Sequence, residues 1–421
     1  MNDALLPAGL FLILFAALQV RIVRYVTYPP ALLSAVWGVT LLWLLATGQR
    51  YLPVSPFTVG IYVAGTIAFA VGGACGWGVA ARSPATTHIG IMAPTWFIPM
   101  LTFLVVVVAP LYTLKLLAVV GTMSPVDFLY AVRVESLETS VGDTVGAIQN
   151  VVPFAMMSAM AAIALPPGSS IGRLCRVILV GAAFSLTILT GSRGAPLTLL
   201  LGMGIIASAR AKRIPVWRTG GVIAVAVVIF GLMAILLRKG RAGPESSVGE
   251  NVVAVADGVQ DYALGGIVAF EGVVSDPGSV PAVWSPLRTV EEMLNHLGAT
   301  FEVPSQHAQF STIGDGMVTN VYTMYFSYFP EMGLVGMLCL ISMVGVIAGI
   351  VHRLAVDGSV MALLFHGVIA AALLLTIFKE PFYTNANFLL KLALYGAVVT
   401  LVVRRRSRSP LRAVELERSR A

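Results

Sequence analysis

The chain has 421 residues, of which 57% are hydrophobic and 11% charged, with a formal net charge of +7 and a mean hydropathy of +0.88. So few charges on so apolar a chain exclude an ordinary water-soluble enzyme and predict a protein that crosses a membrane many times. The excess of basic over acidic residues follows from membrane topology, as described below, and does not predict binding to nucleic acid.

Apolar runs long enough to cross about 30 Å of hydrocarbon recur along the chain. There are eleven, at residues 4–20, 30–47, 57–80, 91–114, 147–166, 177–191, 195–209, 219–237, 326–351, 360–378 and 388–403. We therefore predict an all-α, polytopic membrane protein with about eleven spans (10 to 12), in which residues 1–421 form a single transmembrane domain.

The distribution of Lys and Arg predicts the orientation. If the amino terminus faces outward, 17 of the 27 basic residues face inward, including seven arginines in a basic cytoplasmic tail at residues 404–421. The segment at 115–146, the turn from Gly191 to Gly194, the loop at 238–325 and the loop at 379–387 then lie outside. Membrane lipid is an expected partner of the spans and of the basic tail.

The loop at residues 238–325 is the largest polar stretch and holds ten of the twenty acidic residues. Residues 290–297 place apolar side chains at helical spacing, which predicts a short helix lying on the membrane domain. We expect this large, partly helical loop to carry polar chemistry at the outer face.

Arginines at the outer face are candidates for a phosphate site, because a guanidinium group keeps its charge and grips phosphate oxygens with a planar fork. Arg193 lies in the turn TGSRG, where it either joins backbone amides in an anion site or caps a helical hairpin. Arg238 and Arg241 share one helical face or are interfacial anchors, and Arg133 either binds substrate or pairs with nearby glutamates. Arg288, in the loop, is a further candidate.

Several side chains in the loop could bind sugar hydroxyls or remove a proton from an attacking hydroxyl group. They are Glu271, Glu292, Glu302, Asp315, His296 and His307. A solvated or structural role remains the alternative for each of them. The sequence has no HExxH, GxSxG, Gly-rich nucleotide loop or DxD motif, so we expect no metal or other cofactor and no soluble nucleotide sugar as substrate.

The segment TNVYTMYFSYFPEMGLVGMLCL, at Thr319–Leu340, resembles the segment that re-enters the membrane in Wzy-type O-antigen polymerases, which join oligosaccharide repeat units. The matching residues are Asn320, Val321, Tyr322, Thr323, Tyr328, Phe329, Glu331, Gly333 and Gly336. Glu331 stands for a more usual Asp, Met332 for an aromatic residue, and Pro330 intervenes. The stretches LTGSRGAPLTLLLG and LYAVRVES, the latter around Arg133, are similar to two further family segments, and the shared layout covers about residues 90–400.

This resemblance implies a GT-C-like fold and a glycosyl transfer at the periplasmic face of the bacterial inner membrane. A growing glycan on undecaprenyl diphosphate would be moved onto a new lipid-linked repeat unit, in concert with a flippase and a chain-length regulator. One or more of the arginines would neutralise the diphosphate leaving group, and a loop residue such as Glu271 or His296 would act on the acceptor hydroxyl. The residues expected to bind substrate are Arg238, Arg288, Asp315, Asn320, Tyr322, Tyr325 and Glu331.

Three alternatives remain open. A related ligase, which places O-antigen on lipid A, often has His-Asn where Thr319 and Asn320 stand here. A lipid-linked oligosaccharide flippase would also be polytopic, but would be expected to carry charges in mid-membrane and paired broken helices. A non-catalytic scaffold for envelope assembly is the third.

Overall fold

The computed structural model describes most of the chain. The residues described are 3–81, 90–121, 128–129, 131–132, 145–166, 169–210, 221, 228–229, 231, 248–276, 291, 294–295, 297–301, 310–383, 385–401 and 403–406. The helices of this part are α1 (Leu5–Val23), α2 (Pro29–Thr47), α3 (Pro56–Ala81), α4 (Phe97–Val120), α7 (Val151–Ala164), α8 (Ser170–Ile188), α9 (Gly194–Arg210), α11 (Val248–Ser275), α13 (Met324–Val356), α14 (Val360–Leu374) and α15 (Ala386–Thr400). Short 3-10 helices, η1 (Gly48–Arg50) and η2 (Gly146–Asn150), follow α2 and precede α7.

The helices confirm a mostly helical, multi-pass membrane protein. Seven are long and apolar enough to cross a membrane, counting η1 with α2 and η2 with α7, and α9, α14 and α15 are shorter apolar helices. Each coincides with a predicted apolar run. The predicted run at 219–237 lies largely outside the described residues, as does half of the predicted helix at 290–297.

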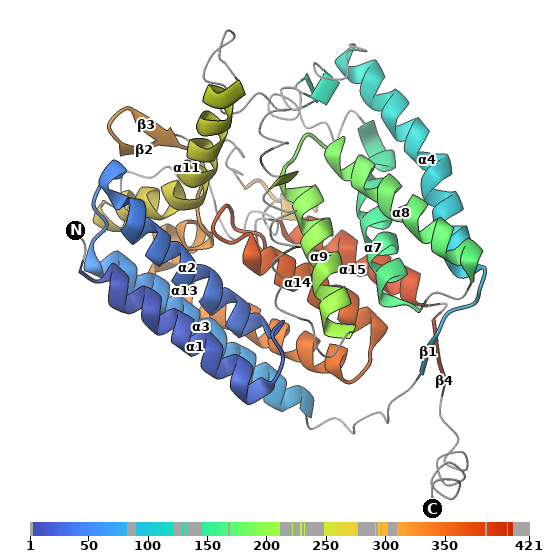
Figure 1. Cartoon of the computed structure of the whole chain (residues 1–421), viewed down its shortest axis with the longest axis horizontal. Coiled ribbons are helices and arrows are strands. Elements are labelled where there is room, and N and C mark those ends of the chain that lie inside the picture. Colours follow the sequence, from blue (N-terminus) through green and yellow to red (C-terminus); the bar gives the residue numbers. More distant parts are fainter. Residues whose placement is uncertain are drawn as a thin grey trace, which may run out of the picture.

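The helices pack in two groups that share α14 (Figure 1). Helices α1, α2, α3 and α13 form one apolar core, onto which α11 packs through residues 263–273. Helices α4, α7, α8, α9 and α15 form the other. Local signals begin some of these helices: Pro29 and Pro30 open α2, and the Ser169 and Ser359 side chains cap α8 and α14.

Glycines allow α3 and α13 to cross in close contact. A β carbon at Gly76 would lie 2.8 Å from the carbonyl carbon of Val346, and one at Gly349 would lie 2.9 Å from the carbonyl carbon of Gly73. Side chains at these positions would push the helices apart. Small residues have this role in membrane proteins, where close packing replaces a hydrophobic force between helices.

Helix α13 is interrupted near its start. Pro330 lies inside it, and Gly333 has φ 60° and ψ −176°, a conformation outside the helical region that glycine alone adopts readily. Before this break the chain holds Tyr325 and Tyr328 in the core, and after it the helix runs to Val356. The apolar run predicted at 326–351 is therefore two helical segments joined by a kink.

Two short antiparallel strand pairs were not predicted. β2 (Ser311–Gly314) pairs with β3 (Met317–Thr319), with an irregular register next to Gly314. β1 (Gly90–Met92) pairs with β4 (Arg404–Arg406), so the start of the basic tail lies beside the segment that precedes α4. The fourth apolar run was expected to be helical from residue 91, but α4 begins at Phe97.

Candidate functional site

Segments far apart in the sequence meet at one end of the bundle, which we call the α11 face. It is formed by residues 48–55, 190–194, 375–383, the β2–β3 hairpin and α11. The Leu52 amide donates a hydrogen bond to the Ile313 carbonyl at 2.8 Å, and the Met324 amide donates one to the Thr376 carbonyl at 3.2 Å. These contacts join the α2–α3 connection to the β2–β3 hairpin, and the start of α13 to the segment that follows α14.

Arg193 lies in the predicted turn of the α11 face. The turn follows α8, with Gly191 at φ 66°, and ends where α9 begins at Gly194. The Ser192 hydroxyl accepts a hydrogen bond from the Gly194 amide at 3.2 Å. The Arg193 guanidinium carbon lies 5.1 Å from the centre of the Tyr262 ring on α11, a cation–π contact that ties the turn to this helix.

Lys379 is a second cation at this turn and was not among the predicted site residues. Its Nζ atom would lie 3.2 Å from a β carbon at Gly194, so Arg193 and Lys379 flank the same glycine. Burial lowers the pKa of Lys379, and the neighbouring Glu380 opposes this shift. The only signal in the sequence for Lys379 was its place in a short loop expected outside.

Glu380 fixes the loop that carries Lys379. Only 2% of Glu380 is exposed, and one carboxylate oxygen accepts hydrogen bonds from the Tyr328 hydroxyl and from the amides of Phe382 and Tyr383 at 2.5, 2.6 and 3.0 Å. The Asn385 side chain donates to the Glu380 carbonyl at 2.9 Å. A buried carboxylate with this many donors orders the chain around it, so the position of Lys379 is set by the core.

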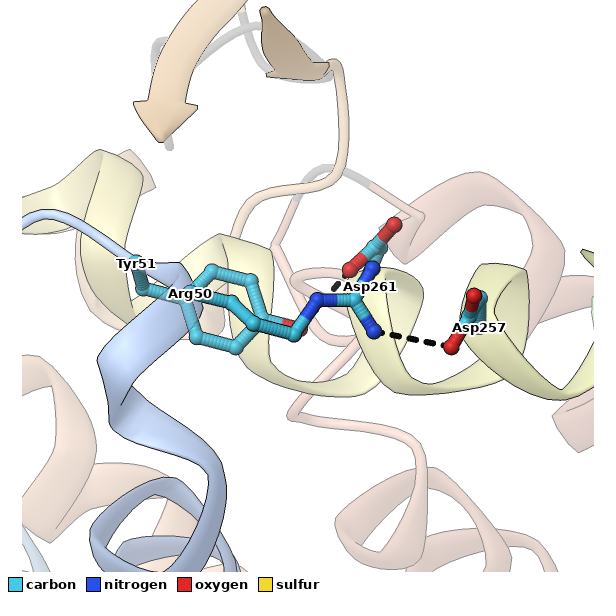
Figure 2. Close-up of polar contacts among 4 residues, drawn as sticks. All are labelled: Arg50, Tyr51, Asp257 and Asp261. Carbon is cyan, nitrogen blue, oxygen red and sulfur yellow. Dashed lines mark hydrogen bonds and ion pairs between the residues drawn. The ribbon is translucent and has the colours of Figure 1, made fainter. Parts of the chain in front are cut away.

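Polar contacts also join the α2–α3 connection to α11. Figure 2 shows the guanidinium of Arg50 lying between the carboxylates of Asp257 and Asp261, with an ion pair of 2.8 Å to Asp257. The Tyr51 hydroxyl donates to Asp261 at 2.7 Å. Burial, followed by this hydrogen bond, raises the pKa of Tyr51, which therefore remains a donor at neutral pH.

Glu271 connects the carboxyl-terminal end of α11 to the start of α3. Its carboxylate accepts hydrogen bonds from the Ser55 amide at 2.7 Å, the Ser55 hydroxyl at 2.9 Å and the Ser275 hydroxyl at 3.0 Å. Burial alone would raise the pKa of Glu271, but these donors, together with Thr58, lower it below the ordinary value. The negative charge also lies near the amino terminus of α3, where the helix dipole favours it. This arrangement gives Glu271 a structural role, and its catalytic role stays a prediction.

A cavity of about 870 Å³ opens beside Glu271 at the α11 face. Its walls come from the start of α1, the end of α2 and the α2–α3 connection. The lining residues are Asp3, Ala4, Leu5, Leu44, Leu45, Gly48, Gln49, Tyr51, Leu52, Pro53, Val54, Ser55, Pro56 and Glu271. We call it the Glu271 cavity.

The remaining predicted residues fall into different environments. Tyr325 is fully buried, with its ring centre 4.6 Å from that of Tyr62, which gives it a packing role, and its contact with sugar stays a prediction. Tyr322 is also buried, its hydroxyl 3.0 Å from that of Ser311. Asp315, Asn320 and Glu331 are exposed, the first two in or next to the β2–β3 hairpin.

The structure does not test the other predicted residues. Eight lie outside the described residues: Arg133, Arg238, Arg241, Arg288, Glu292, His296, Glu302 and His307. Within the described part of the chain, no group of three or more His, Cys, Asp or Glu residues could hold a metal ion. No protein-family model, curated protein or solved structure matches this chain.

Proposed function

We propose that this protein polymerises undecaprenyl-diphosphate-linked oligosaccharide repeat units at the α11 face. The observation that carries the proposal is the pair of cations flanking Gly194, Arg193 in the turn and Lys379 from the distant loop. Two fixed positive charges at the ends of membrane helices suit a diphosphate attached to a lipid. The similarity of Thr319–Leu340 to the family segment supports the same reaction.

The reaction would be a displacement at the first sugar of the donor glycan. A hydroxyl oxygen of the acceptor sugar would form the new glycosidic bond while the bond between the donor sugar and the diphosphate breaks. The electron pair of that bond leaves with undecaprenyl diphosphate, and the hydroxyl proton passes to a base. Arg193 and Lys379 would stabilise the charge that develops on the diphosphate, which is where electrostatic catalysis contributes most.

Other predicted residues keep their proposed roles. Arg133, Arg238, Arg241 and Arg288 would supply further positive charge for two lipid-linked substrates. His296 or Glu271 would act on the acceptor hydroxyl, with Glu271 the less suited because its hydrogen bonds keep it ionised and engaged. We propose no metal or organic cofactor.

The distribution of basic residues supports an outward α11 face. Arg24, Arg210 and Arg353 lie at or just after the ends of α1, α9 and α13, away from that face. Basic residues favour the cytoplasmic side. By the family resemblance, the membrane would be the bacterial inner membrane and the α11 face periplasmic.

A flippase is the second candidate, and one observation favours it. His352 and His366 are buried between helices, with ring centres 4.6 Å apart, and ionisable residues within membrane helices often mark transport pathways. A ligase would use the same cations for a different acceptor. The site geometry alone favours neither enzyme over the other.

The test is complementation of a polymerase-null bacterium that makes the matching repeat unit, with surface glycan displayed as a length ladder on a gel. We expect the native chain to restore the ladder, and Arg193→Ala and Lys379→Ala to leave mostly single repeats at equal membrane levels. The matched control is Arg173→Ala, an exposed arginine of α8 near the opposite end of the bundle, which should keep the ladder. Full ladders from both site variants would contradict the proposal. A ladder that forms without this protein but fails to reach lipid A would indicate a ligase. Repeat units that accumulate on the cytoplasmic side would indicate a flippase.

A further inference from the structure

The Glu271 cavity has the size and composition of a site for a hydroxyl-rich ligand. Its volume of about 870 Å³ lies within the usual range for small-molecule sites, and most of its walls are apolar. Among the described lining residues, two are carboxylates and none is Lys or Arg. Such a cavity repels phosphate and favours neutral groups that donate hydrogen bonds.

Acceptor capacity remains at Asp3. A carboxylate offers about four lone-pair positions, and the Glu271 carboxylate engages them with Ser55, Ser275 and Thr58. Asp3 is exposed, and its side chain makes no hydrogen bond to another described residue. Sugar hydroxyl groups could therefore donate to Asp3 without breaking the contact between α11 and α3.

The cavity and the cation pair lie along the same helix. Tyr262, which contacts Arg193, and Glu271 both belong to α11, and a separation of nine residues corresponds to about 13 Å along the axis. Residues 263–270 between them are buried, so protein core separates the cavity from the cation pair and the cavity is a distinct site. The two sites differ in charge as the glycan and the diphosphate of a lipid-linked saccharide do.

We propose that the Glu271 cavity binds the neutral glycan portion of a lipid-linked repeat unit. This inference rests on the proposed function and adds a specificity site to it. The cavity would contribute affinity for sugars, and the cation pair would contribute affinity for the lipid diphosphate.

Gly48 offers a way to fill the cavity with little disturbance. It lines the cavity, its φ of −65° suits any residue, and a β carbon there would meet no atom within 4 Å. Gly48→Trp should therefore occupy the cavity, and Asp3→Asn should remove one carboxylate. Gly60→Trp is the matched control, because Gly60 is exposed on α3, has the same open surroundings and does not line the cavity.

The experiment measures binding to full-length protein in lipid nanodiscs by native mass spectrometry. The probes are undecaprenyl diphosphate without sugar and the lipid-linked repeat unit extracted from cells that lack the polymerase. We expect the native chain to bind the sugar-bearing lipid about tenfold more tightly, as one or two hydrogen bonds to carboxylates allow. Gly48→Trp should lose this preference, Asp3→Asn should reduce it, and both should bind the bare lipid as the native chain does. Gly60→Trp should keep the preference.

The outcomes separate the two proposals. If Gly48→Trp keeps the preference, the glycan does not occupy the cavity, and the proposed function still stands. If Gly48→Trp loses affinity for both probes, the cavity serves the lipid or the fold, which also overturns the inference. If the native chain binds neither probe, the proposed function fails, and the inference fails with it.

Discussion

The glycine contact between α3 and α13 gives a prediction with a magnitude. In Gly76→Ala the new β carbon would lie 2.8 Å from the carbonyl carbon of Val346, whereas carbon atoms pack best at about 3.5 Å or more. The carbonyl oxygen of Val346 would lie closer still, so the helices must separate by more than about 0.7 Å at this point, and a gap of that size loses at least a quarter of the local dispersion energy. We expect the free energy of unfolding to fall by about 1–3 kcal/mol, which is typical of overpacked cores.

Gly78→Ala is the matched control. It lies two residues further along α3, and a β carbon there would meet no atom within 4 Å. Because alanine favours helix by up to about 1 kcal/mol over glycine, Gly78→Ala should be as stable as the native chain or more so. The assay is unfolding of the purified proteins in detergent micelles by SDS titration, followed by circular dichroism. Equal stability of Gly76→Ala and Gly78→Ala would refute the close contact.

The other predictions concern the kink, the buried carboxylate and Glu271. Gly333→Ala should lower the free energy of unfolding by about 1–3 kcal/mol in the same assay, because a φ of 60° strains any residue with a side chain. A variant as stable as the native chain would mean that the break in α13 is absent. Glu380→Ala should lower the free energy of unfolding by about 3 kcal/mol, because it leaves buried donors without an acceptor. Asp257→Asn should lower it by less than about 1 kcal/mol, because the side chains of its ion pair are 41% and 48% exposed. Similar losses in the two variants would contradict this contrast. The pKa of Glu271 is lowered by folding, so its stabilising contribution is present above its unfolded pKa of about 4.3 and is lost as pH falls through its folded pKa. Glu271→Gln should therefore lose less stability than the native chain between pH 5 and 3, and parallel pH profiles would show that the shift is absent.

Much of the bundle could be predicted from the sequence, because hydrophobic length is a local property. The spans from α1 to α3 and the turn at Gly191–Gly194 follow from apolar runs and glycines that lie next to one another in the chain. The division of loops between two faces followed from counting Lys and Arg. The α11 face brings together the turn at Gly191–Gly194 and the described parts of the loops at 238–325 and 379–387.

Contacts between distant segments could not be predicted in this way. Lys379 meets Gly194 only because α9 packs against α14, and no local pattern records this packing. The ion pair of Arg50 with Asp257 joins residues separated by 207 positions. The break at Gly333 was hidden inside an apolar run, since glycine and proline are common in membrane helices.

The candidate site was predicted in part. Arg193 was singled out from its turn, but its contact with Tyr262 depends on how α11 lies over the bundle. Tyr325 was taken for a substrate contact because it adjoins the family-like segment, whereas the structure buries it in an aromatic cluster. Sequence similarity alone does not distinguish the core from the surface.

The most direct test of the account is chain growth by the purified protein in liposomes that contain only the lipid-linked repeat unit. We predict glycans of several repeats, the release of one undecaprenyl diphosphate for each bond formed, and the loss of both products in the Arg193→Ala and Lys379→Ala variants. Folded native protein that forms no glycan and releases no undecaprenyl diphosphate under these conditions would contradict the proposed polymerase.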